Sequence, residues 1–351
     1  MYKQKKPVRF PFLDFSTREA RESACRREVA LNSRLAPDVY RGVATVLGPD
    51  GEPCDHLVVM RRMPDSRRLS NLLGSRDAAE HMRRIAKVMA AFHAEAATSA
   101  EIDSAATAEA VAQNWRDNFE EVRRFAGRYL DAGALARAEG LAVGFLAGRR
   151  ALFDHRIAAG KIRDGHGDLL ADDIFCLPDG PRILDCIEFS DRLRYGDVLS
   201  DIAFLAMDLE RLGRPDLAVE FVNRYREFSG EDAPEPLVHH YIAYRAQVRS
   251  KVACLRAEQG DPEAAAEAAR LLEIAVRHLE RARVRLVLIG GLPGTGKTTL
   301  AHLISEDRGW AHWHSDDTRK ELAGIPPSTP APAPYGEGLY AGETTRATYR
   351  A

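Results

Sequence analysis

The sequence has no apolar run long enough to cross a membrane and no pair of closely spaced cysteines. No stretch approaches the roughly 18 uninterrupted apolar residues of a membrane-spanning helix. The first six residues contain lysines but lack the apolar segment of a secretory signal. The five cysteines are scattered and odd in number, which argues against a disulfide framework or a zinc site. These absences predict a cytoplasmic protein with reduced thiols and no membrane partner.

A strong charge imbalance is also absent. The 351 residues include 50 Lys and Arg and 52 Asp and Glu, so the formal net charge is −2. General nucleic-acid-binding proteins usually carry a basic excess, and we therefore expect no nucleic-acid partner. Hydrophobic residues make up 45% of the chain, which excludes disorder over its whole length. At about 150 residues per domain, the length predicts two domains or three.

The first 65 residues have the most strand-like pattern in the chain. The segments 8–13 and 56–60 predict short strands. Between them, Ser16 and Glu19 form a capping box that predicts the start of a helix. A Gly-Pro-Asp-Gly sequence predicts a turn before the second strand.

The segment 66–283 is mainly helical. Apolar residues recur at helical spacing over eight stretches, namely 77–97, 108–129, 134–146, 149–159, 198–212, 217–228, 236–258 and 261–283. Between the fourth and fifth of these, a strand at 174–177, a Pro-Asp-Gly turn and a strand at 182–187 predict a hairpin.

The pattern changes again at residue 284. The sequence Val-Arg-Leu-Val-Leu-Ile-Gly predicts a buried strand there. Five prolines between residues 326 and 334 then predict a stiff, extended stretch. Residues 284–351 therefore form a third segment of a different kind.

The clearest chemical pattern lies around the predicted hairpin. His166-Gly167-Asp168 is followed by Asp173 before the hairpin and by Asp185 after it. Phosphoryl transfer needs an acid that orients the attacking hydroxyl and takes its proton, and oxygen ligands that hold Mg²⁺ against the ATP phosphates. The order predicts Asp168 as the base and Asp173 and Asp185 as magnesium ligands. The alternative is a chance turn followed by surface aspartates.

These motifs resemble a known family. Together with Gly196-Asp197 and Asp201, the His166–Leu169 loop and Asp185 are similar to the aminoglycoside phosphotransferase family, over roughly residues 1–280. The segments from Phe12 to Thr17 and from Asp185 to Phe189 resemble a subgroup in which such a domain is fused to a P-loop ATP-binding domain.

The resemblance implies a fold and a set of roles. The fold is an α+β protein-kinase-like domain of two lobes, with a small N-lobe at 1–65 and a mainly helical C-lobe at 66–283. Asp168, with His166 in the same loop, would be catalytic, and Asp185 would bind the metal. Lys5 would hold the ATP phosphates and pair with Glu28 on the first helix. Val58 to Met63 would form the strand and hinge near the adenine.

Two departures from the family pattern matter. The family usually has Asn five residues after the base, where this chain has Asp173, which adds a negative charge near the triphosphate. A glycine-rich hairpin normally precedes the phosphate-binding lysine, but no glycine occurs before Gly42. We therefore expect an N-lobe that is incomplete or a chain that starts late. A kinase fold that has lost activity is an alternative.

A second motif lies in the C-terminal segment. Gly291-Leu-Pro-Gly-Thr-Gly-Lys-Thr matches the P-loop pattern and lies between a predicted strand and a predicted helix over 299–305. Backbone N–H groups of such a loop bind phosphate oxygens, the lysine neutralises them, and the hydroxyl after it binds magnesium. The nucleotide-binding residues predicted here are Gly291, Gly294, Gly296, Lys297, Thr298 and Thr299, with Thr298 also a metal ligand.

The rest of this segment is short for a complete nucleotide-binding domain. Asp316 and Arg319 resemble the acceptor-side segment of small P-loop kinases. One strand, or two, cannot make a sheet that is covered on both faces. Residues 284–351 are therefore expected to form only the first part of a P-loop kinase domain, so that the chain looks truncated at both ends.

The leading functional hypothesis is transfer of phosphate from ATP, with Mg²⁺, to a hydroxyl group of a small molecule. One alternative is a nucleotide-binding regulatory or scaffold protein without phosphoryl transfer, which the missing glycine-rich hairpin favours. Another is a P-loop kinase that the first domain merely supports. The sequence identifies neither the acceptor nor the oligomeric state.

Overall fold

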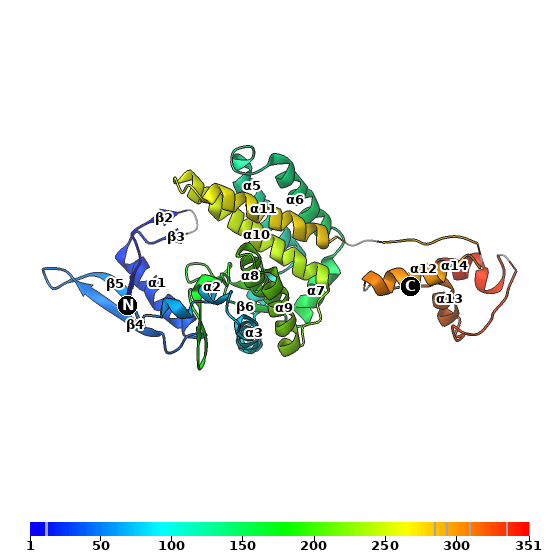
Figure 1. Cartoon of the computed structure of the whole chain (residues 1–351), viewed down its shortest axis with the longest axis horizontal. Coiled ribbons are helices and arrows are strands. Elements are labelled where there is room, and N and C mark those ends of the chain that lie inside the picture. The colour runs from blue at the N-terminus through cyan, green and yellow to red at the C-terminus, as the bar shows by residue number, and fades with distance from the viewer. Residues whose placement is uncertain (11–12, 284–285, 293, 309, 335, 351) are drawn as a thin grey trace. The chain divides into compact units, whose positions relative to one another are not determined.

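The computed structural model describes residues 1–10, 13–283, 286–292, 294–308, 310–334 and 336–350. The chain divides into two compact units, Met1–Val284 and Arg285–Ala351. The first unit contains a small lobe built on a sheet and a larger helical lobe (Figure 1). Among the described residues, no helix is both long and apolar enough to cross a membrane.

The small lobe is a three-stranded antiparallel sheet with one helix against it. The strands β1 (Tyr2–Gln4), β5 (Pro53–Met60) and β4 (Tyr40–Leu47) lie in the order β1-β5-β4. The helix α1 (Arg18–Asn32) packs against β4 and β5. The sheet places Lys3 opposite Val58 at its edge.

The predictions for this lobe are partly confirmed. The segment 56–60 lies in β5, and the predicted turn closes the β4–β5 hairpin through a bond from the Gly48 N–H to the Glu52 carbonyl. The single strand predicted at 8–13 is wrong. Its described residues belong to two short strands, β2 (Arg9–Phe10) and β3 (Leu13–Asp14), that pair antiparallel because the chain reverses direction there. Residues 11 and 12 lie outside the described residues.

The N-cap of α1 is one residue later than predicted. The Thr17 side chain accepts a hydrogen bond from the Ala20 N–H. The hydroxyl and amide of Ser16 both donate instead to Asp14 Oδ1, so Ser16 is not available as the cap.

The larger lobe is a bundle of helices. Each of the eight stretches predicted to be helical contains a helix over its central residues. Its α-helices are α2 (Leu69–Leu72), α3 (Ala78–Glu95), α4 (Ala100–Ser104), α5 (Ala108–Val122), α6 (Ala132–Leu146), α7 (Arg150–Ala158), α8 (Val198–Arg211), α9 (Pro215–Ser229), α10 (Glu235–Glu258) and α11 (Ala264–Arg281). Single 3₁₀ turns occur at η1 (Asp65–Arg67), η2 (Arg123–Phe125) and η3 (Ala171–Asp173).

The larger lobe also contains two short antiparallel pairs of strands. One pairs β6 (Ile162–Asp164) with β9 (Tyr195–Asp197), and the other pairs β7 (Ile174–Leu177) with β8 (Gly180–Ile183). The predicted hairpin is therefore present, but its second strand ends earlier than expected. Asp185 has φ 66°, a left-handed conformation that a strand cannot continue through.

Two apolar clusters hold the first unit together. In the larger lobe, α8 is buried along nearly its whole length and packs against α9, α10 and α11. The second cluster joins Val58 and Met60 of β5 to Phe175 and Leu184 around the β7–β8 hairpin. The hairpin is thus anchored in the small lobe as well as in the large one.

The second unit contains α12 (Lys297–Arg308), α13 (Ser315–Leu322), η4 (Gly338–Tyr340) and α14 (Gly342–Thr348). The helix predicted at 299–305 lies within α12. The buried strand predicted at 284–290 is wrong for residues 286–290, which form no strand, and residues 284 and 285 lie outside the described residues. Leu286 and Leu288 are 82% and 84% exposed. Since the described residues of this unit form no neighbouring strand, the described part of the apolar run has no strand to pair with.

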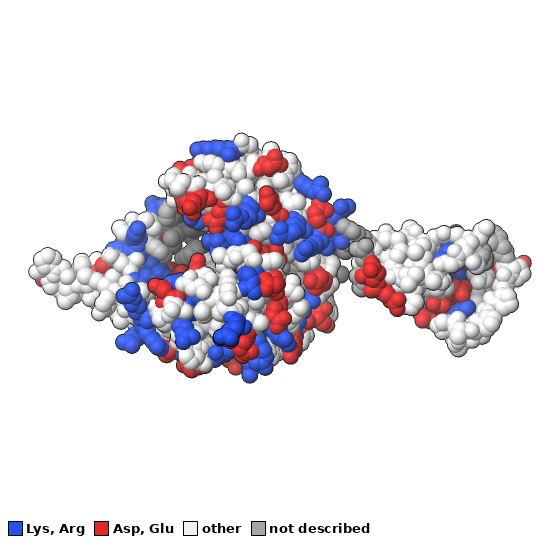
Figure 2. All heavy atoms as spheres, in the orientation of Figure 1, with Lys and Arg blue, Asp and Glu red and all other residues white. Residues whose placement is uncertain are grey.

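Basic and acidic side chains are interspersed over the visible face of Met1–Val284 (Figure 2). On α1 the same mixture occurs along one helix, where Arg26 pairs with Glu22 one turn away. Such pairs contribute little stability individually, because solvent screens exposed charges.

Candidate active site

The loop that carries Asp168 is held by one buried carboxylate. The N–H groups of His166 and Gly167 donate to the two oxygens of Asp201, at 2.6 and 2.8 Å. A side chain on Gly165 would collide with the same carboxylate, so only glycine fits at that position. Asp201 lies in the first turn of α8, which is itself fixed in the core. The backbone of the loop is therefore set by the centre of the larger lobe.

His93 completes the support of Asp201. Its Nε2 lies 3.2 Å from Asp201 Oδ2, and its Nδ1 lies 2.9 Å from the Tyr225 hydroxyl. Burial acts to raise the pKa of Asp201, but the hydrogen bond and charge of His93 and the hydrogen bond from the His166 N–H outweigh it and hold that pKa well below its usual range. Asp201 is therefore a permanent anion that binds the loop.

His166 points into the protein rather than toward solvent. It is fully buried, and its Nε2 lies 3.1 Å from the Leu184 carbonyl oxygen. Burial lowers the pKa of His166, which favours the neutral ring. The ring joins the loop to the segment that precedes Asp185. This location fits a positioning residue, and the catalytic role expected from the sequence stays a prediction.

Asp168 is partly exposed at the end of this loop. Burial raises its pKa to about 6, although the nearby charges of Arg249 and Arg245 act in the opposite direction. Two further carboxylates, Asp185 and Asp208, also raise it. A carboxylate with a pKa close to neutral is suited to accepting a proton from a hydroxyl.

The β7–β8 hairpin brings Asp173 and Asp185 together. Ile174 pairs with Ile183 at the open end of the hairpin, and the Leu184 N–H donates to the Asp173 carbonyl at 2.9 Å. Burial raises the pKa of Asp173 to about 7, and the negative charges of Asp185 and Asp168 add to this effect. Asp173 and Asp185 offer the oxygen donors that a divalent cation of the Mg²⁺ type prefers, but within the described part of the chain no three His, Cys, Asp or Glu side chains lie close enough together to hold a metal ion.

Two lysines reach this acidic group from the small lobe. Lys3 Nζ lies 2.9 Å from Glu28 Oε1 and also contacts Asp185. Lys5 Nζ lies 2.5 Å from Glu28 Oε2 and also contacts Glu188. Burial acts to raise the pKa of Asp185, but the charge of Lys3 outweighs it and keeps that pKa below its usual value. The predicted pair of Lys5 and Glu28 is present, yet Lys3 is the lysine that contacts Asp185.

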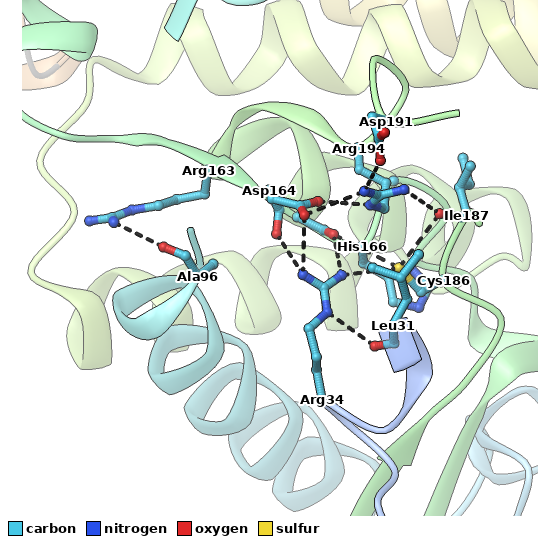
Figure 3. A network of polar contacts seen from close by, with 12 residues as sticks. Leu31, Arg34, Ala96, Arg163, Asp164, His166, Cys186, Ile187, Asp191 and Arg194 are labelled. Carbon is cyan, nitrogen blue, oxygen red and sulfur yellow. Dashed lines mark hydrogen bonds and ion pairs between the residues drawn. The ribbon is translucent and has the colours of Figure 1, made fainter. Parts of the chain in front are cut away.

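A network of arginines ties α1 to the same loop (Figure 3). Arg34, just after α1, donates to the carbonyl oxygens of Asp164 and Gly165 at 3.1 and 3.0 Å. Arg194 binds Asp164 Oδ1 at 2.7 Å and the Ile187 carbonyl at 2.9 Å. The catalytic loop and the segment after Asp185 are thus held by both lobes.

Comparison with known proteins identifies the family. A family model described as "Phosphotransferase enzyme family" (APH) matches residues 9–237. The chain belongs to this phosphotransferase family. Two uncharacterised proteins, from Mycobacterium tuberculosis and Mycobacterium bovis, are each 46% identical to it over 350 residues, which cover 99% of this chain and 70% of each relative. The expected protein-kinase-like α+β fold of the first unit is thereby supported.

Solved structures with a similar arrangement are more distant. A choline/ethanolamine kinase family protein from Mesorhizobium loti is 15% identical, with a TM-score of 0.47, over 79% of this chain and 85% of that one. A choline kinase from Cryptosporidium parvum is 12% identical, with a TM-score of 0.47, over 85% and 81% of the two chains. An aminoglycoside 2′-phosphotransferase is 16% identical, with a TM-score of 0.43, over 79% and 92%.

Sequence reasoning missed two residues of this phosphotransferase site, Lys3 and Arg34. Lys3 and Lys5 are two residues apart, so their side chains leave an extended chain on the same side and both reach Glu28. Only the register of β1 on β5 shows that Lys3 lies at Asp185. Arg34 follows the end of a helix, and nothing in its local sequence points to a carbonyl 130 residues away.

The sequence motif of P-loop type lies in the second unit. Gly291, Gly294 and Gly296 have φ values of 156°, 77° and 80°, conformations that favour glycine. Lys297 begins α12, and its ammonium donates to the Leu292 carbonyl at 2.7 Å. Thr298 and Thr299 are exposed in the first helical turn. Residue 293 of the motif lies outside the described residues.

Asp316 and Arg319 are engaged inside the second unit. Asp316 pairs with Lys320 at 2.9 Å and accepts a hydrogen bond from the Tyr340 hydroxyl at 3.2 Å. The Arg319 guanidinium lies 4.8 Å from the centre of the Tyr340 ring. The structure gives them a packing role between α13 and η4. Among the described residues, it shows no contact between either of them and the P-loop.

Proposed function

We propose that the chain transfers the γ-phosphoryl group of ATP to a hydroxyl group of a small molecule. The observation that carries the proposal is the placement of Asp173 and Asp185 at the open end of the β7–β8 hairpin, with Asp168 in the loop before it and the Lys3–Glu28 pair against Asp185. Membership of a phosphotransferase family supports the same reaction class. The proposal includes ATP and Mg²⁺ as requirements and a cytoplasmic location.

In this proposal Asp168 accepts the proton of the acceptor hydroxyl as its oxygen bonds to the γ-phosphorus. The bond from that phosphorus to the β-bridging oxygen breaks, and ADP leaves. Lys3, held by Glu28, binds phosphate oxygens and keeps the triphosphate in line with the hydroxyl. Asp173 and Asp185 would hold Mg²⁺, which neutralises charge on the phosphates when bound. Positioning and charge neutralisation supply most of the rate in such reactions.

The test is the rate of acceptor-dependent ADP formation in the Asp168→Asn variant. We expect a loss of about a hundredfold or more, because general-base catalysis of this kind contributes that much. Asp172→Asn is the matched control, since Asp172 is an exposed neighbour that binds Ser70 at 2.6 Å. An Asp168→Asn variant with full activity would show that the assignment is wrong.

A second candidate function rests on the P-loop. Its three glycines have the backbone conformations that the motif requires, and α12 begins at its lysine. We infer from this an additional ATP-binding site in which Gly291, Gly294, Gly296, Lys297, Thr298 and Thr299 contact phosphates and Thr298 also contacts Mg²⁺. Lys297→Ala separates the two: it abolishes turnover if the P-loop transfers phosphate, and leaves turnover intact if Asp168 does.

The third possibility is binding of ATP without transfer, as in a regulatory or scaffold protein. Calorimetry of Mg·ATP with the Lys297→Ala variant isolates the site in the first unit. Binding that Asp185→Ala abolishes, combined with no ADP formation over a broad acceptor panel, would favour this reading over catalysis.

A further inference from the structure

A pocket lies beside the loop that carries Asp168. It is formed by the ends of α4 and α5, the segment 192–197, the start of α8 and one face of α10. Its polar and aromatic lining includes Asn114, Arg192, Tyr195, Ser200, Tyr241 and Arg245. The mechanism above assigns no role to any of these side chains.

Backbone contacts place this pocket next to the reacting centre. The Leu193 carbonyl oxygen at its edge would lie 3.0 Å from a Cβ atom on Gly167, so the two segments touch at the catalytic loop. Ser200 precedes Asp201, the residue that binds the loop, and its carbonyl accepts a hydrogen bond from Arg245 Nε at 3.1 Å. The pocket is therefore joined to the loop that carries Asp168 through Leu193 and through the start of α8.

One polar group in the pocket is buried without a partner. The Tyr241 side chain is 4% exposed, and its hydroxyl makes no hydrogen bond within the described part of the chain. An unpaired buried hydroxyl costs free energy, roughly 1–3 kcal/mol, unless a ligand or water satisfies it. Tyr241 lies one helical turn before Arg245, so both point to the same side of α10.

The charge of the pocket is positive. The charges of Arg245 and of the next residue on that face, Arg249, act on the carboxylate of Asp168. The Arg245 guanidinium donates through Nε to the Ser200 carbonyl and lies 4.6 Å from the centre of the Phe204 ring. Asp197, the carboxylate in the lining, is already bound by two nitrogens of Arg156 at 2.7 and 2.8 Å. Arg192 donates to Asn114 at 3.0 Å and lies 3.9 Å from Asp117, so it is only partly neutralised.

We propose that this pocket binds the acceptor through an anionic group, a carboxylate or a phosphate, that Arg245 and the Tyr241 hydroxyl bind together. The inference rests on the proposed function and narrows its substrate to hydroxyl compounds that carry negative charge. Guanidinium groups bind both anions strongly, and Tyr195 and Tyr244 provide flat apolar walls beside them. A polycation would meet Arg192 and Arg245 with no free carboxylate among the pocket residues.

Binding is measured first, by calorimetry on the whole chain without ATP. The probes are gluconate and glucose 6-phosphate, with glucose as their neutral counterpart. We expect one anion to bind at least tenfold more tightly than glucose, and which one binds distinguishes a carboxylate from a phosphate. Arg245→Gln should weaken that binding about ten- to a hundredfold, because it removes a hydrogen bond to a charged group.

Two further variants keep the result interpretable. Tyr241→Phe removes only the hydroxyl and keeps the ring in the core, so a loss of anion binding there cannot come from a folding defect. Lys251→Gln removes one positive charge from the same helix outside the pocket, where Lys251 pairs with Glu121 at 3.1 Å. We expect Lys251→Gln to leave anion binding unchanged. An equal effect of Lys251→Gln and Arg245→Gln would overturn the proposal.

Turnover is measured separately so that the two proposals can fail independently. Anion binding that depends on Arg245, without ADP formation from any acceptor, would retain the pocket and overturn the transferase function. ADP formation with glucose, choline or kanamycin but with neither anion would retain the transferase function and overturn the anionic acceptor. Failure of both anions to bind better than glucose would also overturn it.

Discussion

In the proposed reaction, Asp168 is the side chain whose loss is expected to lower the rate most. Its protonation also affects the stability of the fold. Its pKa in the folded protein is about 6, against about 4 in an unfolded chain. Because the folded pKa is the higher one, the stabilising contribution is complete below the unfolded value and is lost as pH rises through 6. Above that pH the folded protein contains a carboxylate that burial disfavours.

Asp168→Asn should therefore stabilise the metal-free protein at pH 7.5 by about 1–3 kcal/mol. At pH 4, where the folded Asp168 is neutral and the unfolded one is about half ionised, most of the difference should disappear. The measurement is urea unfolding of both proteins at the two pH values with EDTA present. A variant that is less stable than the parent at pH 7.5 would contradict the assigned environment of Asp168.

Lys3 and Lys5 have similar sequence contexts but different surroundings. The Lys3 side chain is 35% exposed and reaches Asp185, whereas the Lys5 side chain is 8% exposed and lies between Glu28 and Glu188. We therefore assign ATP binding to Lys3 and structural stability to Lys5.

Lys3→Met should lower kcat/KM for ATP about ten- to a hundredfold with little change in Tm. Lys5→Met should instead destabilise the fold by about 3–5 kcal/mol, because it leaves the buried Glu188 without its cation and the buried Glu28 with Lys3 alone. Steady-state kinetics and thermal unfolding of both variants test the pair. The reverse outcome, with Lys5 controlling kinetics and Lys3 controlling stability, would restore the role that the sequence suggested for Lys5.

At the scale of elements, the catalytic loop depends on the absence of one side chain. A Cβ atom on Gly165 would collide with Asp201, whose carboxylate is fixed by two backbone N–H groups and by His93. Neither partner can move without loss of those bonds.

Gly165→Ala should thus reduce ADP formation at least tenfold and lower Tm, since the loop and α8 must separate. Gly144→Ala is the control, because Gly144 lies inside α6 with no atom near its would-be Cβ. That change should stabilise the helix by about 0.5–1 kcal/mol. Equal Tm values for Gly165→Ala and the parent protein would show that the loop tolerates displacement.

The elements that sequence patterns predicted are those with a local cause. The eight long helices have apolar residues at helical spacing, and the 174–177 strand is bounded by a turn sequence. The strand β1 has no such signal, because Tyr2, Lys3 and Gln4 are extended only through pairing with β5. Likewise β4 begins with Tyr40, Arg41 and Gly42, a start that gives no clear alternation.

The same distinction applies to the site. The spacing of Asp168, Asp173 and Asp185 was readable because one short hairpin joins them. The partners that distant segments supply could not be predicted from the sequence. Lys3 is 182 residues from Asp185, and Arg245 lies on a helix far along the chain from Asp168. Their proximity follows from packing of the lobes, which local sequence does not encode.

At the scale of the whole molecule, the second unit begins with a segment that has exposed apolar side chains. Leu286 and Leu288 are more than four-fifths exposed, and residues 286–292 form no helix or strand. By contrast Leu193 is 45% exposed, but the N–H groups of the next two residues bond to Asp191. Proteases require an unpaired backbone as well as a suitable side chain.

Limited thermolysin digestion should therefore cut first between Leu286 and Leu292. The larger fragment, which contains the phosphotransferase unit, should unfold at the Tm of that unit in the whole chain. Mass spectrometry of the early fragments and calorimetry of the larger one provide the test. Early cuts at Leu193 would show that the segment beside the proposed acceptor pocket is not held as described.

The helix α1 and the residues just after it contact both the lysines near Asp185 and the loop that carries Asp168. Glu28 faces the lysines, Asn32 accepts the Cys186 N–H at 2.9 Å, and Arg34 follows the last turn to grip the catalytic loop. Each residue added to a helix turns everything beyond it by about 100°. Insertion of one alanine between Glu28 and Asn32 would leave every chemical group intact. It would, however, rotate Asn32 and Arg34 away from their partners while Glu28 keeps its lysines.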